Sequence, residues 1–138
     1  MPMDVIRVRV HPSVKVIKKS AFQYRRQLTT VILNDGLEEI GRGAFRMCTS
    51  LQGIDVPPTV KSIKDGAFSW CSTLTTVTLH DGLEEIGAAA FCMCTSLQGI
   101  VVPPSVKVIN YQAFRESSPL TTVTLQDGLG KIGAEAFF

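Results

Sequence analysis

Phenylalanine recurs every 23 residues along this chain, and this spacing constrains the fold more than any other feature. An alanine precedes each phenylalanine, and isoleucine and a Leu/Val column share the same period. The columns are Phe22, Phe45, Phe68, Phe91, Phe114 and Phe137; Ala21, Ala44, Ala67, Ala90, Ala113 and Ala136; Ile17, Ile40, Ile63, Ile86, Ile109 and Ile132; and Val14, Leu37, Val60, Leu83, Val106 and Leu129. Columns in register over six units indicate a repeat protein.

Counting Val5 as position 1 divides the chain into units 5–27, 28–50, 51–73, 74–96, 97–119 and a truncated 120–138. Apolar residues at positions 4 and 6 have the period of a half-buried strand. One 23-residue coil cannot bury both sides of its apolar residues, so each coil must stack on its neighbours. We therefore predict that residues 1–138 form one six-coil solenoid. It has a parallel β-sheet on one face and turns or short helical turns on the other.

A second period of 46 residues overlies the first, because odd and even units turn differently after the strand. Odd units use Pro12, Pro58 and Pro104, whereas even units use Asp35-Gly36, Asp81-Gly82 and Asp127-Gly128. Position 11 also alternates in sign, as Lys15, Glu38, Lys61, Glu84 and Lys107. We expect a ladder of opposite charges there, in which each exposed pair contributes about 0.2–1 kcal/mol.

The composition is that of a chain able to fill a core, since 45% of its residues are hydrophobic and its net charge is only +2. General disorder is therefore excluded, and the charge does not require a nucleic-acid partner. No apolar run approaches the roughly 20 residues of a membrane helix. The segment from Met1 to Val14 lacks the apolar block of a secretory signal. We expect an intracellular chain without a membrane span.

The repeat resembles the BspA-like leucine-rich repeat family over residues 5–138. The stretch Leu97–Ser118 carries the pattern: a leucine, a short strand, Pro-Pro, Ser-Val, Ile and Ala-Phe. Cys48-Thr49-Ser50 and Cys94-Thr95-Ser96 complete it. This resemblance implies a protein-interaction or surface-adhesion module with no catalytic residues. The absence of a signal or anchor in this chain departs from the secreted members.

Catalytic and metal chemistry finds little support in the residues. Cys48, Cys71 and Cys94 share position 21, with Cys92 two residues before Cys94. A ladder places these thiols in a row, whereas zinc needs four converging ligands, so we predict a column of small buried thiols. The histidines His11 and His80 lie three coils apart, or about 14 Å at the strand spacing. We predict no metal, cofactor or catalytic residue.

The predicted sheet offers the first candidate surface for an unidentified protein partner. Positions 3, 5 and 7 of each coil are expected to face solvent, including position 7 with His11, Asn34, Pro57, His80, Pro103 and Gln126. Position 20 has two interpretations: packing beneath the returning loop, or an apolar edge stripe that a partner contacts. Its residues are Tyr24, Met47, Trp70, Met93 and Glu116. The candidate partner-binding residues are Thr30, Ile32, Asp55, Thr76, Thr78, Val101, Trp70 and Tyr24.

The two ends of the array differ in character. Residues 5–27 hold seven of the fourteen Lys and Arg residues, which suits an anionic partner or a charged end that keeps the solenoid soluble. At the other end, nothing in the sequence covers a candidate end interface of Leu120, Val123, Leu125, Phe137 and Phe138. We predict an interaction or scaffolding module. The alternatives are an assembly subunit that packs through its C-terminal coil, including with itself, and an adhesin-like surface fragment.

Overall fold

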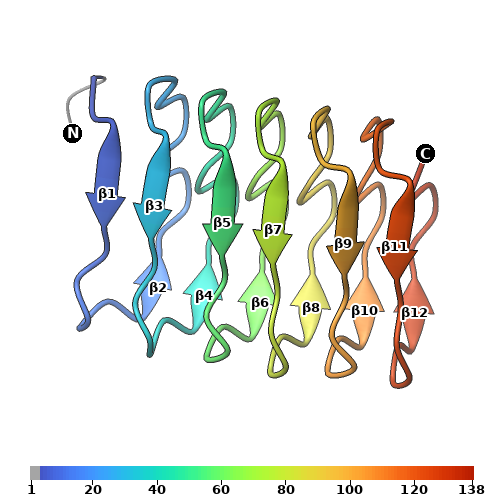
Figure 1. The fold of residues 1–138 in the computed structure, drawn as a ribbon. Helices are drawn as coiled ribbons and strands as arrows, with labels where there is room; N and C mark the ends of the chain where they lie inside the picture. Colours follow the sequence, from blue (N-terminus) through green and yellow to red (C-terminus); the bar gives the residue numbers. More distant parts are fainter. Residues whose placement is uncertain (1–3) are drawn as a thin grey trace.

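A computed structural model describes residues 4–138, so residues 1–3 of the predicted array lie outside the described part. Each coil contributes one three-residue strand and one two-residue strand, and this part contains no helix (Figure 1). The longer strands are β1 (Arg7–Arg9), β3 (Thr30–Ile32), β5 (Gly53–Asp55), β7 (Thr76–Thr78), β9 (Gly99–Val101) and β11 (Thr122–Thr124). The shorter ones are β2 (Val16–Ile17), β4 (Glu39–Ile40), β6 (Ser62–Ile63), β8 (Glu85–Ile86), β10 (Val108–Ile109) and β12 (Lys131–Ile132).

The coils stack in the register that the 23-residue period requires. In the longer strands Val8 pairs with Val31, and in the shorter strands Ile17 pairs with Ile40, always in parallel. The predicted six-coil solenoid with its parallel sheet is therefore confirmed. A second sheet, of order β12-β10-β8-β6-β4-β2, runs unbroken along the other face. The sequence analysis expected turns or short helical turns there, because two-residue strands are too short to show a period of two.

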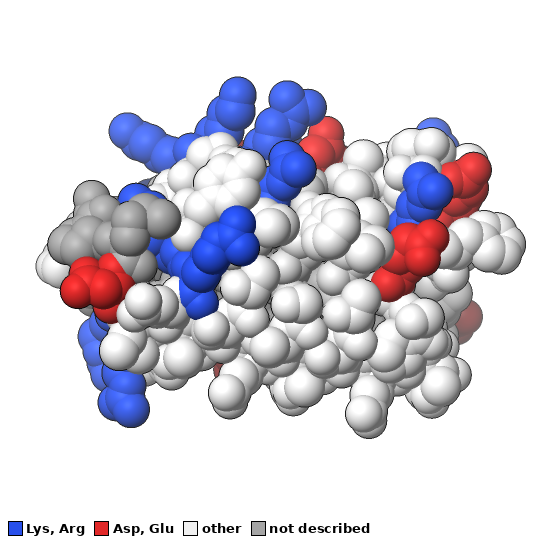
Figure 2. Space-filling view, turned by 90° about the horizontal axis from the view of Figure 1, so that it is seen from above, with Lys and Arg blue, Asp and Glu red and all other residues white. Residues whose placement is uncertain are grey.

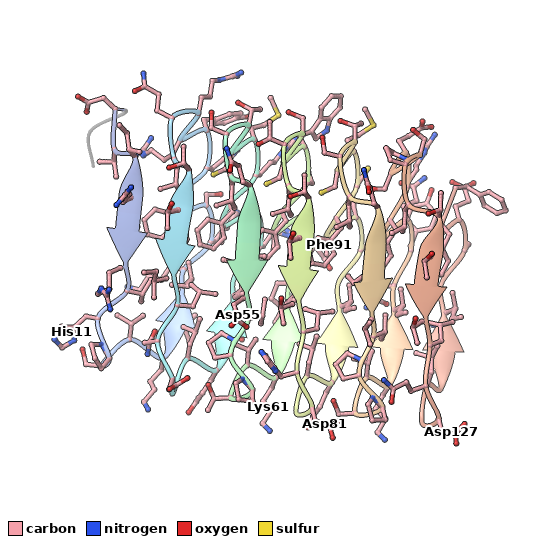
Figure 3. The ribbon with its side chains drawn as sticks, viewed as in Figure 1. His11, Asp55, Lys61, Asp81, Phe91 and Asp127 are labelled. Carbon is pink, nitrogen blue, oxygen red and sulfur yellow. The ribbon has the colours of Figure 1, made fainter. Side chains whose placement is uncertain are left out.

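The core is a ladder of stacked side chains. The six repeated phenylalanine rings lie 5.2–5.3 Å apart between centroids and 2–7° from parallel. Phe45, Phe68 and Phe91 are fully buried, and Figure 3 shows Phe91 behind the longer strands. Each of the four inner rings thus buries both faces against its copies, which supports the inference that single coils have no independent core.

The cysteines form the predicted column of buried thiols beside the phenylalanines. The Sγ atoms of Cys48, Cys71 and Cys94 donate to the phenylalanine carbonyl of the preceding coil over 3.2–3.3 Å. Ser117 makes the same bond in the fifth coil. Burial raises the pKa of the Cys48 thiol to about 11 and that of Cys94 to about 12. These thiols stay protonated near neutral pH, and all four cysteines are unpaired.

The junction from an odd coil to the following even coil is closely packed. Between the third and fourth coils, strands β5 and β7 form a ladder, and Thr75 and Thr76 both donate their N–H to the Gln52 carbonyl. A Cβ added at Gly82 would lie 2.3 Å from the Pro58 carbonyl oxygen. Glycine in the even coil therefore lets the two backbones approach each other.

The junction from an even coil to the following odd coil uses a hydroxyl bridge. Between the fourth and fifth coils, Gly82 N–H donates to Ser105 Oγ over 2.9 Å, and Ser105 donates to the Leu83 carbonyl over 2.6 Å. Thr59 makes the same bridge between the second and third coils. Among the described residues, no ladder joins β3 to β5 or β7 to β9. The 46-residue period therefore corresponds to two alternating kinds of junction.

Two details of the predicted surface need comment. Position 7 was expected to face solvent, and His11 and Gln126 are exposed there, but for Asn34, Pro57 and Pro103, which are buried, the expectation fails. The prediction was wrong for these three because the chain already turns inward there: Asn34 Nδ2 donates to the Pro12 and Val14 carbonyls. At position 11 the backbones stack, with Lys61 N–H donating to the Glu38 carbonyl. The salt bridges formed within residues 4–138 include none from this column, so its stabilising role stays a prediction.

Candidate functional site

The outer side of the longer strands is an exposed face across all six coils. Strands β3, β7 and β9 have the burial pattern exposed, buried, exposed, so their first and third residues point outward. Ile32 is 45% exposed and Val101 53%. The outward residues that the sequence analysis selected on this face, Thr30, Ile32, Asp55, Thr76, Thr78 and Val101, are all exposed. We call these six residues the sheet face.

Two shallow hollows lie along the sheet face. One, of about 320 Å³, is lined by residues that include Ile32, Asp55 and His80. In it His80 Nε2 lies 2.7 Å from Asp55 Oδ1, and Figure 3 places Asp55 at the end of β5. The other, also about 320 Å³, is lined by residues that include Thr78 and Val101. The first hollow thus has a mixed polar and apolar lining, whereas that of the second is more apolar.

The His80–Asp55 contact is the one place on the sheet face that resembles a catalytic pair. Both side chains are well exposed, at 40% and 74% of their surface, and a general base works best where its pKa is tuned by burial or neighbouring charges. Within residues 4–138, no three His, Cys, Asp or Glu side chains are grouped so that they could hold a metal ion. The arrangement is suited to recognising a partner by hydrogen bonds.

A second surface lies along the edge where each coil turns back after the Ala-Phe pair. The position-20 residues adopt left-handed backbone there, with φ of 64° at Tyr24 and 63° at Trp70. Large side chains are rare in this conformation. Tyr24 is 42% exposed and Trp70 43%, so packing beneath the loop accounts for only part of each side chain. Sequence reasoning missed the strain, because no glycine marks this column.

A groove of about 570 Å³ runs along this edge across the first four coils. Its floor is made of small residues that include Gly43, Gly66 and Ala89, and Lys19, Arg42, Arg46, Asp65 and Trp70 are among the residues that line it. We call it the turn groove. Of the two position-20 residues predicted to contact a partner, Trp70 lines the turn groove, and Tyr24 lies on the same edge without lining it.

Charge is unevenly spread over this edge. Figure 2, which looks down on it, shows Lys and Arg gathered over the half that includes the first coils, whereas towards the other end Lys and Arg lie together with Asp and Glu. The basic first unit noted in the sequence therefore extends into the second coil, through Arg42 and Arg46. Sequence reasoning missed this extension because it considered charge unit by unit.

The last coil carries the candidate end interface. Leu125 is 41% exposed, Phe137 38% and Phe138 81%, whereas Leu120 and Val123 are half-buried. A hollow of about 350 Å³ is lined by residues that include Leu120, Val123, Leu125 and Phe137. Phe137 is stacked on Phe114 on one side only. The side chains of this coil therefore form an apolar surface. In the described residues, no helix is long and apolar enough to cross a membrane.

Comparison with known proteins gives a consistent picture. A family model described as BspA type leucine rich repeat region matches residues 15–138 in six copies. No curated protein sequence matches. A leucine-rich repeat protein of T. pallidum is similar, with a TM-score of 0.78 and 23% identity, over 93% of this chain and 73% of its own.

Two further solved structures have the same fold. A leucine-rich cell surface protein of Faecalibacterium prausnitzii matches with a TM-score of 0.85 and 27% identity, over 90% of this chain and 33% of its own. A leucine-rich repeat protein of Bacteroides ovatus matches with a TM-score of 0.64 and 22% identity, over 98% of this chain and 46% of its own. The chain spans about a third of the length of the first of these proteins and less than half of the second.

Proposed function

The chain belongs to the BspA-type leucine-rich repeat family, and from this premise we propose that it is a non-catalytic module that binds a protein partner through the sheet face. Proteins of this family are typically surface or interaction modules. The observation that carries the proposal is the exposure of Ile32 and Val101, each of which lines a hollow on the same face. Apolar side chains that are set in a polar surround are typical of the centre of an interface.

The rest of the sheet face supports this assignment. Its threonines Thr30, Thr76 and Thr78 are exposed and offer hydroxyls that both donate and accept hydrogen bonds. Its strands are short and each is paired with one neighbouring strand, so little backbone order has to be gained on binding. A rigid surface loses less conformational entropy when a partner docks.

Selection from a random peptide library on the immobilised chain tests the proposal. We expect most enriched peptides to lose binding to a Val101→Arg or Ile32→Arg variant, because a large charged side chain would fill either hollow. The Lys131→Ala variant, changed at an exposed site of the other sheet, serves as the matched control and is expected to retain binding. Enriched peptides that bind both arginine variants as well as the parent chain would refute the assignment.

We propose as a second candidate that the last coil mediates assembly. The supporting observation is the exposure of Leu125, Ile132 and Phe137 on one coil. Light scattering on the 138-residue chain over a wide concentration range tests it: we expect a mass that grows with concentration and returns to about 15 kDa in a Leu125→Lys variant. A constant monomer mass would refute the candidate and leave the sheet-face proposal standing.

A further inference from the structure

We propose that the turn groove binds an extended acidic segment of a protein partner, with carboxylates at its N-terminal-coil end and an apolar side chain against Trp70. This surface is separate from the sheet face, since it lies at the edge where the coils turn back. Its existence therefore does not depend on the sheet-face proposal.

The end of the groove formed by the N-terminal coils carries two cationic side chains that could bind a carboxylate. Lys19 and Arg46 line it, and neither side chain takes part in a salt bridge or side-chain hydrogen bond formed within residues 4–138. Arg46 presents a planar guanidinium, which matches a carboxylate with two parallel hydrogen bonds. A ligand carboxylate at this end would therefore meet two cations whose donors are not already used.

The one carboxylate among the groove-lining residues is already engaged. Asp65 Oδ2 lies 3.4 Å from Arg42 Nη2, and Asp65 Oδ1 accepts the Ala88 N–H over 2.9 Å. Asp65 therefore offsets Arg42 and leaves the other two cations uncompensated. Because the pair of Arg42 and Asp65 has no net charge, the middle of the groove offers no free cation to a ligand that is anionic along its whole length.

The far end of the groove is apolar. Trp70 and Cys92 line it. The Trp70 backbone has a φ of 63°, and the residue is 43% exposed. The same left-handed backbone recurs at Met47 and Met93, with φ of 61° and 60°, so it belongs to the repeated turn; what distinguishes Trp70 is its large aromatic side chain. Tryptophan and arginine are the side chains most often found to dominate interface energies. An apolar ligand side chain fits this end best.

The floor and length of the groove match a short extended peptide. The floor residues Gly43, Gly66 and Ala89 are small, and nothing lies within 4 Å of the position a Cβ would take on Gly66. Four coils span about 14 Å at the strand spacing, which an extended chain covers in about four residues. A peptide bound in the groove would therefore have about two residues between its pair of carboxylates and its apolar side chain.

Fluorescence anisotropy with a labelled peptide of sequence Glu-Glu-Gly-Gly-Leu-Leu tests the proposal on the full chain. We expect saturable binding with a Kd below about 1 mM, weakened by salt, and a change in the emission of Trp70, the only tryptophan. The peptide Lys-Lys-Gly-Gly-Leu-Leu is expected not to bind. Absence of binding, or binding without any change in Trp70 emission, would overturn the assignment.

Charge-reversal variants locate the site. Replacing Lys19 and Arg46 by Glu is expected to weaken peptide binding by about tenfold or more. The control reverses the exposed residues Lys107 and Lys131, which changes the net charge equally, and should leave the Kd within about twofold. If the first pair of reversals unfolds the chain, the Lys19→Gln and Arg46→Gln pair replaces it. Equal losses in test and control variants would contradict a local site.

Competition distinguishes a peptide from a polyanion. A heparin-derived hexasaccharide and the oligonucleotide dT₆ carry charge along their whole length, and we expect them to compete less well than unlabelled peptide because of Asp65 and the apolar end. Tighter binding of either polyanion than of the peptide would overturn the peptide proposal.

Discussion

The two kinds of junction in this solenoid differ although the same core runs through both. From the third to the fourth coil, the Val56 N–H donates to the Thr78 carbonyl, and the Glu85 backbone N–H donates to the Lys61 carbonyl. The corresponding bonds are missing from the fourth-to-fifth junction in the part of the chain that the structure describes, where the Ser105 hydroxyl bridges the two turns.

The difference follows from which residue stands at two positions of the repeat. Even coils carry Gly82 and Gly87, where a Cβ would lie 2.3 and 2.6 Å from the preceding backbone. Odd coils carry Ser105 and Asn110 at the same positions, and their side chains donate to the Leu83 and Ile86 carbonyls of the preceding coil. Glycine thus accompanies pairing of the longer strands across the close junction. At the bridged junction, among the described residues, only the shorter strands pair, and a hydroxyl joins the two turns. The structural unit is a pair of coils, of 46 residues.

The largest effect should come from the feature that both junctions share. Phe68→Ala and Phe91→Ala each remove a fully buried ring stacked on both sides, so each should lower the free energy of unfolding by about 3–5 kcal/mol. Urea titration of both variants measures this. One ring lies in an odd coil and the other in an even coil. A difference of more than about 1.5 kcal/mol between them would show that the core is not shared equally.

The close junction is broken most directly at Gly82. A Gly82→Ala variant forces a Cβ against the Pro58 carbonyl and holds alanine at φ of 115°, so we expect a loss of about 3 kcal/mol in the free energy of unfolding. Thermal unfolding followed by circular dichroism measures it. A melting temperature equal to that of the parent chain would mean that the backbones do not need this close approach.

The hydroxyl bridge is broken by Ser105→Ala. This change leaves the Gly82 N–H and the Leu83 carbonyl without their partner, at a cost of about 1–2 kcal/mol. Ser105→Thr keeps the hydroxyl, as Thr59 does in the third coil, and should restore most of the stability in the same urea titration. Equal stability of the alanine and threonine variants would rule out the bridge.

Gly66→Ala separates backbone conformation from close approach. Nothing lies within 4 Å of the added Cβ, but φ is 64°. We expect a loss of about 1 kcal/mol from conformation alone. Comparison of its melting temperature with that of Gly82→Ala isolates the contact with Pro58. If the two variants were equally destabilised, the contact would contribute nothing.

The smallest effect is expected at Thr75, whose hydroxyl donates to the Gln52 carbonyl over 3.1 Å at an exposed site of the close junction. Thr75→Val should lower the free energy of unfolding by about 0.5 kcal/mol, because water can replace the lost bond and the Thr75 backbone N–H still donates there. Matched urea curves resolve this against Ser105→Ala. If Thr75→Val lowered the free energy of unfolding more than Ser105→Ala does, the side-chain hydroxyl would matter more at the close junction than at the bridged one, contrary to the account.

Much of the fold could be predicted from the sequence, because a ladder repeats each constraint six times. The Phe column, the Ile column and the thiols at Cys48, Cys71 and Cys94 all occupy the places their periods imply. Burial at Asn34 could not be predicted, since it depends on hydrogen bonds to the carbonyls of Pro12 and Val14 in the preceding coil.

The candidate sites were less predictable than the core. Exposure of the sheet face followed from strand alternation, since Ile32 and Val101 stand at outward positions. The turn groove did not, because it brings together Lys19, Arg46 and Trp70 from three coils and different repeat positions. A column-by-column search compares equal positions only, so it does not find a site that crosses columns.

The paired-coil account is tested most directly by comparing two fragments of equal length. Residues 5–96 contain two close junctions and one bridged junction, whereas residues 28–119 contain one close junction and two bridged ones. Urea unfolding gives the free energy of unfolding of each fragment, and subtracting one value from the other compares one close junction with one bridged junction. The account predicts that residues 5–96 are the more stable fragment. Equal stability, or greater stability of residues 28–119, would contradict the pair of coils as the structural unit.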